Sequence, residues 1–449
     1  MISRRGALSL LGSASLLAAW HSRGAAAAAQ APAPRPMAGD LDLATLDIVD
    51  SHMHPVRRML ISQSYAGQMA EFGALGAPKG DYPDRDAIVA RAEQGGRDLV
   101  MNAPRRTGYF NYIARTYGVP ATIEGFDSVT KQHIGSDQDF VRYINAIFAR
   151  EKIATVVLQA AEPAPSPPAT LIPADRYVWT TVASELTRIN WAKERGLTTL
   201  ADVRAAIDKT MEVAVERGCR GFKSMAAYYR PLAVSKPTQS EAEAAMKRVL
   251  AATPQSTGVQ NQPIYADAAT NAALTTYEDF LFRHVFAKAG ALERPMIIHS
   301  AVALHPSLRV DFNDPRPLAA VFSDPDMQRA RTDFILIHAG YPSTDVVAAF
   351  ISQFANVYAD VSFYSKYPGA LLQIYRSLLA LGPSSKIMHG SDANSVPEEI
   401  GYCAWNTRAV LAKVLSEYRE SFGWTQDDIT SMAQNVMHRT ARKLFRIPG

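Results

Sequence analysis

Residues 48–55 read Ile48-Val49-Asp50-Ser51-His52-Met53-His54-Pro55. The apolar start of this stretch predicts a buried strand, and two histidines separated by one residue stand at the end of that strand. Because side chains alternate along a strand, both imidazoles face the same way and can bind one ion. The chain holds ten histidines in 449 residues, so such a pair also arises by composition. The ordinary alternative is therefore a pair of surface histidines.

Three later segments repeat the arrangement of an apolar run closed by a polar side chain. Residues 296–298 end in His299, residues 334–337 end in His338, and residues 386–388 lead through a small-residue turn to Asp392. Each alone has an ordinary explanation, which is a hydrogen-bonded core histidine or an aspartate that caps a helix. Their shared position at strand ends favours one common site over four coincidences.

Eight β-branched or apolar runs recur along the chain, with helical patterns between most of them. One such pattern is Leu200 to Gly218, where Thr199 with Asp202 offers a capping box and Gly218 ends the helix. Strands that alternate with helices predict a parallel α/β sheet, and eight of them predict a closed (β/α)8 TIM-type barrel with its chemistry at the C-terminal strand ends. The runs are 46–50, 153–159, 177–183, 221–225, 296–298, 334–337, 357–361 and 386–388.

The spacing between the runs is uneven. About 100 residues separate the first two strands and about 70 separate the fourth from the fifth, so both gaps hold structure beyond a simple crossover. Amphipathic patterns near 85–93 and 140–150 predict that residues 56–150 form a helical insertion, which caps the active-site face of a barrel domain spanning 45–449. The alternative is a further strand at 98–101 or 121–126.

With these residues the chain resembles the metal-dependent amidohydrolase superfamily, and within it the amidohydrolase-2 branch. The resemblance runs from His52 to the closing segment 435–445. Residues 221–224, 338–342 and 390–393 are similar, more narrowly, to the amidohydrolase-like domain that FluG-type proteins fuse to a glutamine synthetase. The resemblance implies that the metal ligands are His52, His54, His299 and Asp392, with His338 polarising the substrate or binding a second ion.

Three imidazoles and one carboxylate suit Zn²⁺ with an open position for water. One ion is expected, while two ions or another divalent metal are alternatives. Such an ion lowers the pKa of its water toward 7, and Asp392 takes up the proton during attack and passes it to the leaving group. His338 donates a hydrogen bond to the substrate oxygen on which negative charge develops.

Lys223 lies at the end of the fourth predicted strand, and three hypotheses for its role stay open. It binds a substrate carboxylate, it forms a carbamate that bridges two metal ions as in superfamily members with two metals, or it makes a structural ion pair. Arg230 and Arg309 are further candidates for binding the substrate's anionic group, against the alternative of solvated loop cations.

The predicted activity is hydrolysis of an amide, lactone or related bond in a small carboxylated molecule by a zinc-activated water. The alternative is non-oxidative decarboxylation of an aromatic or unsaturated acid, because the same branch uses this metal cage for both reactions. A third hypothesis is a barrel without catalysis that serves as a binding protein, but this would require a missing cage residue. The expected binding partner is the small-molecule substrate. The resemblance also implies that the chain can form a homodimer.

Residues 1–29 are typical of an export signal of the twin-arginine kind, with Arg4-Arg5 followed by an apolar run and alanines, and residues 30–44 of a linker. A periplasmic or secreted protein without stable membrane insertion after signal removal is therefore expected. Arg4, Arg5 and Arg23 supply three of the four net positive charges, so the remainder is nearly neutral. This argues against a nucleic-acid binder. Cys219 and Cys403, far apart, indicate neither a disulfide scaffold nor a thiolate metal site.

Overall fold

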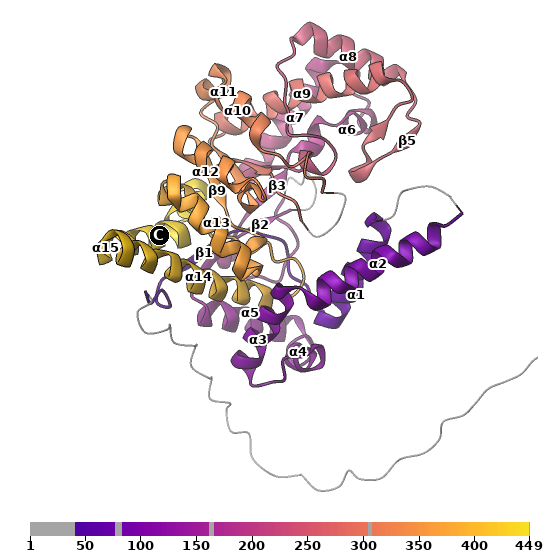
Figure 1. Cartoon of the computed structure of the whole chain (residues 1–449). Coiled ribbons are helices and arrows are strands. Elements are labelled where there is room, and N and C mark those ends of the chain that lie inside the picture. Colours follow the sequence, from indigo (N-terminus) through magenta and orange to yellow (C-terminus); the bar gives the residue numbers. More distant parts are fainter. Residues whose placement is uncertain (1–40, 77–82, 161–165, 304–307, 449) are drawn as a thin grey trace, which may run out of the picture.

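The computed structural model describes residues 41–76, 83–160, 166–303 and 308–448. The predicted export signal and most of the predicted linker lie outside the described residues. Eight parallel strands form one sheet in the order β1-β2-β3-β4-β7-β8-β9-β10. Helices surround this sheet (Figure 1). The strands are β1 (Ile48–Met53), β2 (Ile153–Gln159), β3 (Tyr177–Val182), β4 (Cys219–Ser224), β7 (Met296–His299), β8 (Phe334–Ile337), β9 (Val357–Asp360) and β10 (Ile387–Met388).

Backbone hydrogen bonds join the end of β10 to β1. Ser51 N donates to His389 O at 2.9 Å, and Asp392 N donates to His52 O at 2.8 Å. His54 N donates to Ala393 O at 2.8 Å. The first and last strands therefore lie side by side, and the predicted (β/α)8 TIM-type barrel is confirmed.

Apolar side chains fill the barrel below the site. Val49 of β1 and Ile297 of β7 belong to a buried cluster with Phe445 of α16 (Thr440–Phe445). Ile297 lies two residues before His299 and therefore on the same face of β7. A Cβ added to Gly221 would lie 3.4 Å from both Ile297 and Phe445. Helix α16 thus packs against the apolar side chains that fill the barrel below the polar strand ends.

Helices follow most strands, as the sequence predicts. Thr199 caps α7 (Leu200–Glu216) by accepting a hydrogen bond from Asp202 N, and the long segment between β4 and β7 contains two helices and a small hairpin. The helices are α6 (Ile189–Glu194), α8 (Gln239–Ala251), α9 (Ala268–Ala291), α10 (Ala319–Phe322), α11 (Pro325–Ala330), α12 (Thr344–Gln353), α13 (Pro368–Leu381), α14 (Glu398–Phe422) and α15 (Gln426–Gln434), and the hairpin strands are β5 (Ser256–Thr257) and β6 (Pro263–Ile264). A π-helical turn (Asn435–Arg439) joins α15 to α16.

The insertion between β1 and β2 is helical. Residues 98–101 lie in α2 and residues 121–126 include the start of α4, so the alternative strands there are wrong. Helix α3 packs Tyr109 and Tyr112 against Tyr402 of α14, while α1 and α2 lie together as an arm (Figure 1). Its covering role stays a prediction. The helices are α1 (Ile61–Gly76), α2 (Arg85–Asn102), α3 (Pro104–Tyr117), α4 (Ile123–Thr130) and α5 (Asp137–Arg150).

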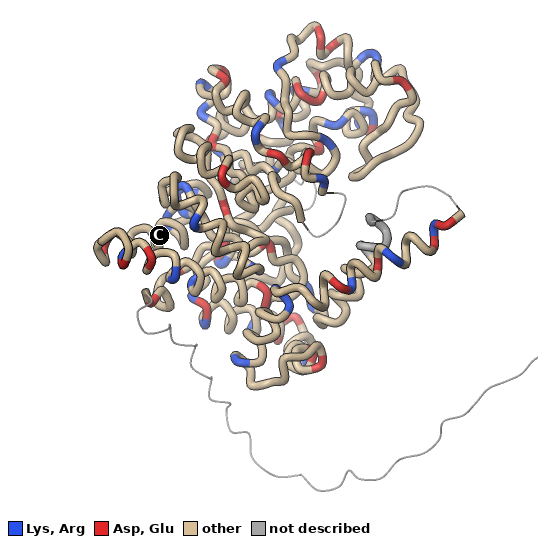
Figure 2. Tube along the Cα trace, in the orientation of Figure 1, with Lys and Arg blue, Asp and Glu red and all other residues tan. Residues whose placement is uncertain are grey.

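Basic and acidic residues are interspersed along the chain trace (Figure 2). Within the described ranges, no helix has the length and hydrophobicity needed to cross a lipid bilayer.

Candidate metal centre

The two histidines of β1 meet Asp392 at the mouth of the barrel. His52 Nε2 and His54 Nε2 each lie 3.4 Å from Asp392 Oδ1. The pairing of β1 with β2 shifts register between Asp50 and Met53, which is a bulge that re-aims the strand end. His52 is buried, whereas the side chain of His54 keeps 30% of its exposure. His54 thus forms the border between the buried centre and the solvent.

Two site residues hold a left-handed backbone conformation. The φ angles are +62° at His338 and +52° at Asp392, values that cost a non-glycine residue free energy. Hydrogen bonds hold both residues in place. Asp360 accepts from His338 N at 2.9 Å, and Asp392 N donates to His52 O at 2.8 Å. Strand ends with this geometry are a feature of functional sites, where surrounding contacts fix an unfavourable conformation.

Ser362 fixes the protonation of the His338 ring. The Ser362 hydroxyl donates to Asp360 Oδ1 at 2.6 Å, so its oxygen is left to accept from His338 Nδ1 at 2.8 Å. The Ser362 carbonyl, which can only accept, lies 3.0 Å from the same nitrogen. His338 therefore carries its proton on Nδ1 and its lone pair on Nε2. This is the ring state that binds a metal, with a carboxylate orienting the ligand through a hydrogen bond.

The tightest group of metal-binding atoms comprises His52, His338 and Asp392, whose donor atoms all lie within 4.8 Å of one another. Burial lowers the pKa of His52 and of His338 to about 3, so both rings are neutral at pH 7. Burial alone would raise the pKa of Asp392, but hydrogen bonds from His52 and His54 hold it well below its ordinary value. Two neutral imidazoles and a carboxylate fit a divalent transition metal.

His299 lies beside this group, and its hydrogen bond differs from that of His338. Its ring centroid is 4.7 Å from that of His338 and 4.6 Å from that of Tyr228. Its Nε2 donates to the carbonyl of Ala301 at 2.9 Å, and its buried Nδ1 has no hydrogen-bond partner among the described residues. The structure thus brings His299 to the site, although His338 takes the place in the tight group that the resemblance gave to His299.

Lys223 points into the same centre. Its Nζ lies 3.0 Å from His52 Nε2, and its side chain is buried. A charged lysine can only donate to this nitrogen, whereas an uncharged amine can also accept from it. Burial lowers the pKa of Lys223 to about 8, which brings the uncharged amine within reach near neutral pH.

The structure does not bring Arg230 and Arg309 to the centre. Arg230 is bound by Glu278 and Asp279 of α9, two buried carboxylates. Arg309 pairs with Asp311 on the surface. Neither arginine lines the two clefts that open at His54, so their predicted role in binding the substrate is not supported by their positions.

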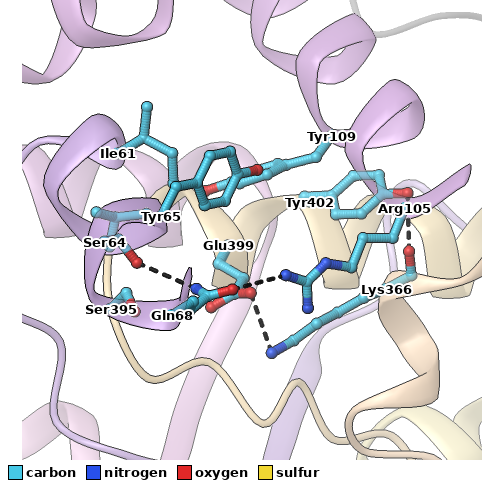
Figure 3. A pocket seen from close by; sticks show the side chains of 11 residues that line it. Ile61, Ser64, Tyr65, Gln68, Arg105, Tyr109, Lys366, Ser395, Glu399 and Tyr402 are labelled. Atoms are coloured by element: carbon cyan, nitrogen blue, oxygen red, sulfur yellow. Dashed lines mark hydrogen bonds and ion pairs between the residues drawn. The ribbon is translucent and has the colours of Figure 1, made fainter. Parts of the chain in front are cut away.

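A buried ion pair supports Asp392 from behind. Lys366 Nζ donates to the carbonyl of Asp392 at 2.7 Å. The same nitrogen lies 3.0 Å from Glu399 Oε1 (Figure 3). Burial alone would lower the pKa of Lys366, but Glu399 and Asp392 raise it, so the lysine is charged. In the same small pocket Arg105 donates to Gln68 at 3.0 Å. Helix α14 therefore supports the candidate metal centre through the contact of Glu399 with Lys366.

Two clefts meet at His54. One, of about 840 Å³, runs between β1 and α1 and is lined by Gln63, Gln68 and Asn394. The other, of about 600 Å³, runs over the ends of β2 and β3 and is lined by Gln159 and Arg188. Both clefts therefore open beside His54, the outermost histidine of the candidate metal centre.

The amidohydrolase family profile matches residues 195–447. The chain belongs to this amidohydrolase family. Protein fluG from Emericella nidulans is 24% identical over 234 residues, which make up 51% of this chain and 25% of fluG. The amidohydrolase chain therefore matches about a quarter of the length of that relative.

Among the solved structures with a similar fold are two that cover nine tenths of this chain. A Lactobacillus casei protein assigned as a metal-dependent hydrolase has a TM-score of 0.64 and 15% identity, with 90% of this chain and 96% of that chain covered. Uronate isomerase from Thermotoga maritima has a TM-score of 0.60 and 13% identity, with 90% and 95% covered. At these identities the likeness shows the barrel fold alone.

Sequence reasoning missed the residues that support the candidate metal centre of this chain. Asp360 closes an apolar strand just as His299 and His338 do, so its position carried the same signal as theirs. Ser362 and Lys366 follow it on a loop, where no periodic pattern marks them. Their roles depend on contacts with His338 and Asp392 that only the folded barrel creates.

Proposed function

We propose that this amidohydrolase is a zinc-dependent hydrolase that cleaves an amide, lactone or related bond in a small carboxylated molecule. The observation that carries the proposal is the tight group of His52, His338 and Asp392 at the C-terminal ends of the strands, where barrel enzymes hold their active sites. His54 and His299 complete the donor set around it. Neutral imidazoles and a carboxylate suit a zinc ion better than they suit a hard cation such as Mg²⁺ or Ca²⁺.

Each residue has a role set by its hydrogen bonds. A bound zinc ion would supply Lewis-acid chemistry, since it polarises a carbonyl and lowers the pKa of water toward 7. Asp392, ionised at neutral pH, accepts the proton of the attacking water and returns it to the leaving group. His338, with its lone pair on Nε2, acts as a metal ligand in this proposal, instead of the hydrogen-bond donor that sequence reasoning suggested.

Lys223 takes one of two roles in this scheme. Its lowered pKa and its contact with His52 suit either a substrate carboxylate that approaches the centre or a carbamate on the uncharged amine, which would bring a second ion. The intact mass of the native protein separates these two roles, because a carbamate adds about 44 Da to the chain. The carbamate would be a bridging ligand of the kind that holds two metal ions together.

The test is turnover of an amide and lactone panel by protein purified without chelator, with its metal content measured in parallel. We expect hydrolysis that Asp392→Asn lowers by several orders of magnitude. Asp311→Asn is the matched control, because Asp311 is an exposed carboxylate paired with Arg309 and its loss should leave turnover unchanged. Release of CO₂ from hydroxybenzoates, with the hydrolysis panel silent, would instead favour a decarboxylase.

We also propose that residues 1–29 direct export to the periplasm. The twin arginines Arg4-Arg5 and the apolar run that follows support this. Cell fractionation of the full chain tests it. Replacing both arginines with lysine should retain the protein in the cytoplasm, and unchanged export would contradict the twin-arginine route.

A further inference from the structure

A buried arginine lines the cleft over β2 and β3. Arg188 lies between β3 and α6 and is 3% exposed. Its guanidinium carbon stacks 4.5 Å from the centre of the Tyr229 ring, which holds the side chain in one place. The same cleft is bordered by His54. A fixed cation therefore shares a cleft with the outermost histidine of the metal centre.

The hydrogen bonds of Arg188 are incomplete. Its Nη1 lies 3.3 Å from Glu185 Oε2, whose side chain keeps 29% of its exposure. Its Nη2 is buried and has no hydrogen-bond partner among the described residues. Gln159 Oε1, at the end of β2 in the same cleft, is buried and also has no such partner. Buried polar atoms of folded proteins are nearly always paired, and these two unpaired atoms belong to residues that line the same cleft, so both are free to bind a polar group there.

We infer that Arg188 and Gln159 form a subsite for a carboxylate that the substrate carries away from its scissile bond. The planar guanidinium matches the two oxygens of a carboxylate, and Gln159 Oε1 would accept from a neighbouring hydroxyl or N–H group. Arg195 lines the same cleft but is exposed, and it stacks on Trp191 while bonding to the Trp191 carbonyl. Arg188 is the buried cation of the cleft, and the assignment rests on the proposed hydrolase function.

Hydroxamates separate the subsite from the metal centre, because the hydroxamate end binds zinc whatever the other end carries. The probes are the monohydroxamates of succinic, glutaric and adipic acid, each compared with the matching amide in which the free carboxylate is replaced by a carboxamide. Calorimetry with the metal-loaded wild type should give binding about tenfold tighter for the carboxylate at the best chain length, as expected for a hydrogen bond to a charged group.

Arg188→Met should reduce this preference to about twofold or less while affinity for the amide probe stays the same. Arg195→Met is the matched control and should keep the preference. Arg188→Lys keeps the positive charge but loses the paired N–H donors of the guanidinium, so it should give an intermediate preference for the carboxylate probe. Equal affinity for both probes in the wild type, or a preference that survives Arg188→Met, would overturn the subsite. Failure of the wild type to bind either hydroxamate would overturn the metal centre itself, which separates the two results.

Discussion

Replacing Lys366 with Met removes the ammonium group that holds the backbone of Asp392 in its left-handed conformation. Lys366 is 3% exposed, and its Nζ lies 2.7 Å from Asp392 O and 3.0 Å from Glu399 Oε1. The variant leaves Glu399, whose side chain keeps 14% of its exposure, with Arg105 as its nearby cation, and it leaves the Asp392 carbonyl without its donor. Breaking a buried pair by removing one partner costs about 3–5 kcal/mol, so the free energy of unfolding should fall by about that amount.

Denaturant unfolding followed by tryptophan fluorescence measures the loss. Lys366→Met combined with Glu399→Gln should recover part of it, because the second change removes the charge that has lost its lysine. Affinity for zinc should also fall by about tenfold or more, the usual effect of losing a group that orients a metal ligand.

Lys386→Met is the matched control for this prediction. Lys386 donates to the carbonyl of Ile351 at 2.9 Å, away from Asp392, so its loss should lower stability without changing zinc affinity. If Lys366→Met unfolds at the wild-type denaturant concentration and keeps its zinc affinity, the support of Asp392 by this lysine is refuted.

Three further perturbations follow from the structure. Phe445→Ala empties the floor of the barrel and should lower the free energy of unfolding by about 3–5 kcal/mol in a urea titration; a loss under 1 kcal/mol, about the cost of a surface change, would contradict the packing. Burial lowers the pKa of His389 from 6.5 to about 3, so its contribution to stability is present above pH 6.5 and is lost as the pH falls toward 3. His389→Gln should therefore reduce the pH slope of stability by about 1.4 kcal/mol per unit between pH 6 and pH 4, and an unchanged slope would count against a buried neutral ring. Chelation with EDTA should lower the melting temperature of protein purified without chelator, in proportion to the zinc removed; calorimetry that shows no shift would mean that no bound metal stabilises the fold.

The barrel was predictable because its strands are buried on both faces. Parallel strands of this kind read as short apolar runs, and all eight runs correspond to barrel strands within a few residues. The polar residues that end them, His52, His299, His338 and Asp392, then had to share one rim. The barrel's geometry places them there once the strand order is known.

What the sequence could not predict depends on contacts between distant segments. Arg230 looked like an anion-binding residue, yet its partners Glu278 and Asp279 come from α9, nearly fifty positions later. The proton on the His338 ring is fixed by Ser362 and Asp360, and no local pattern reports a hydrogen bond between loops. Arg188 carried no signal either, since its importance comes from burial beside His54.

The bulge in β1 was also hidden from the sequence. Simple alternation predicts that His52 and His54 face one side, and both do reach Asp392. The register shift between Asp50 and Met53 shows that the strand deviates from regular pairing just before this point. The prediction that both imidazoles point to the same side agrees with these contacts, whereas the assumption of a regular strand does not hold.

Anomalous diffraction at the zinc edge, on crystals of protein purified without chelator, locates bound zinc. We expect a strong peak in contact with His52, His338 and Asp392, with His54 and His299 beside it. A peak elsewhere, or no peak in crystals grown with added zinc, would contradict a metal centre at the mouth of this barrel.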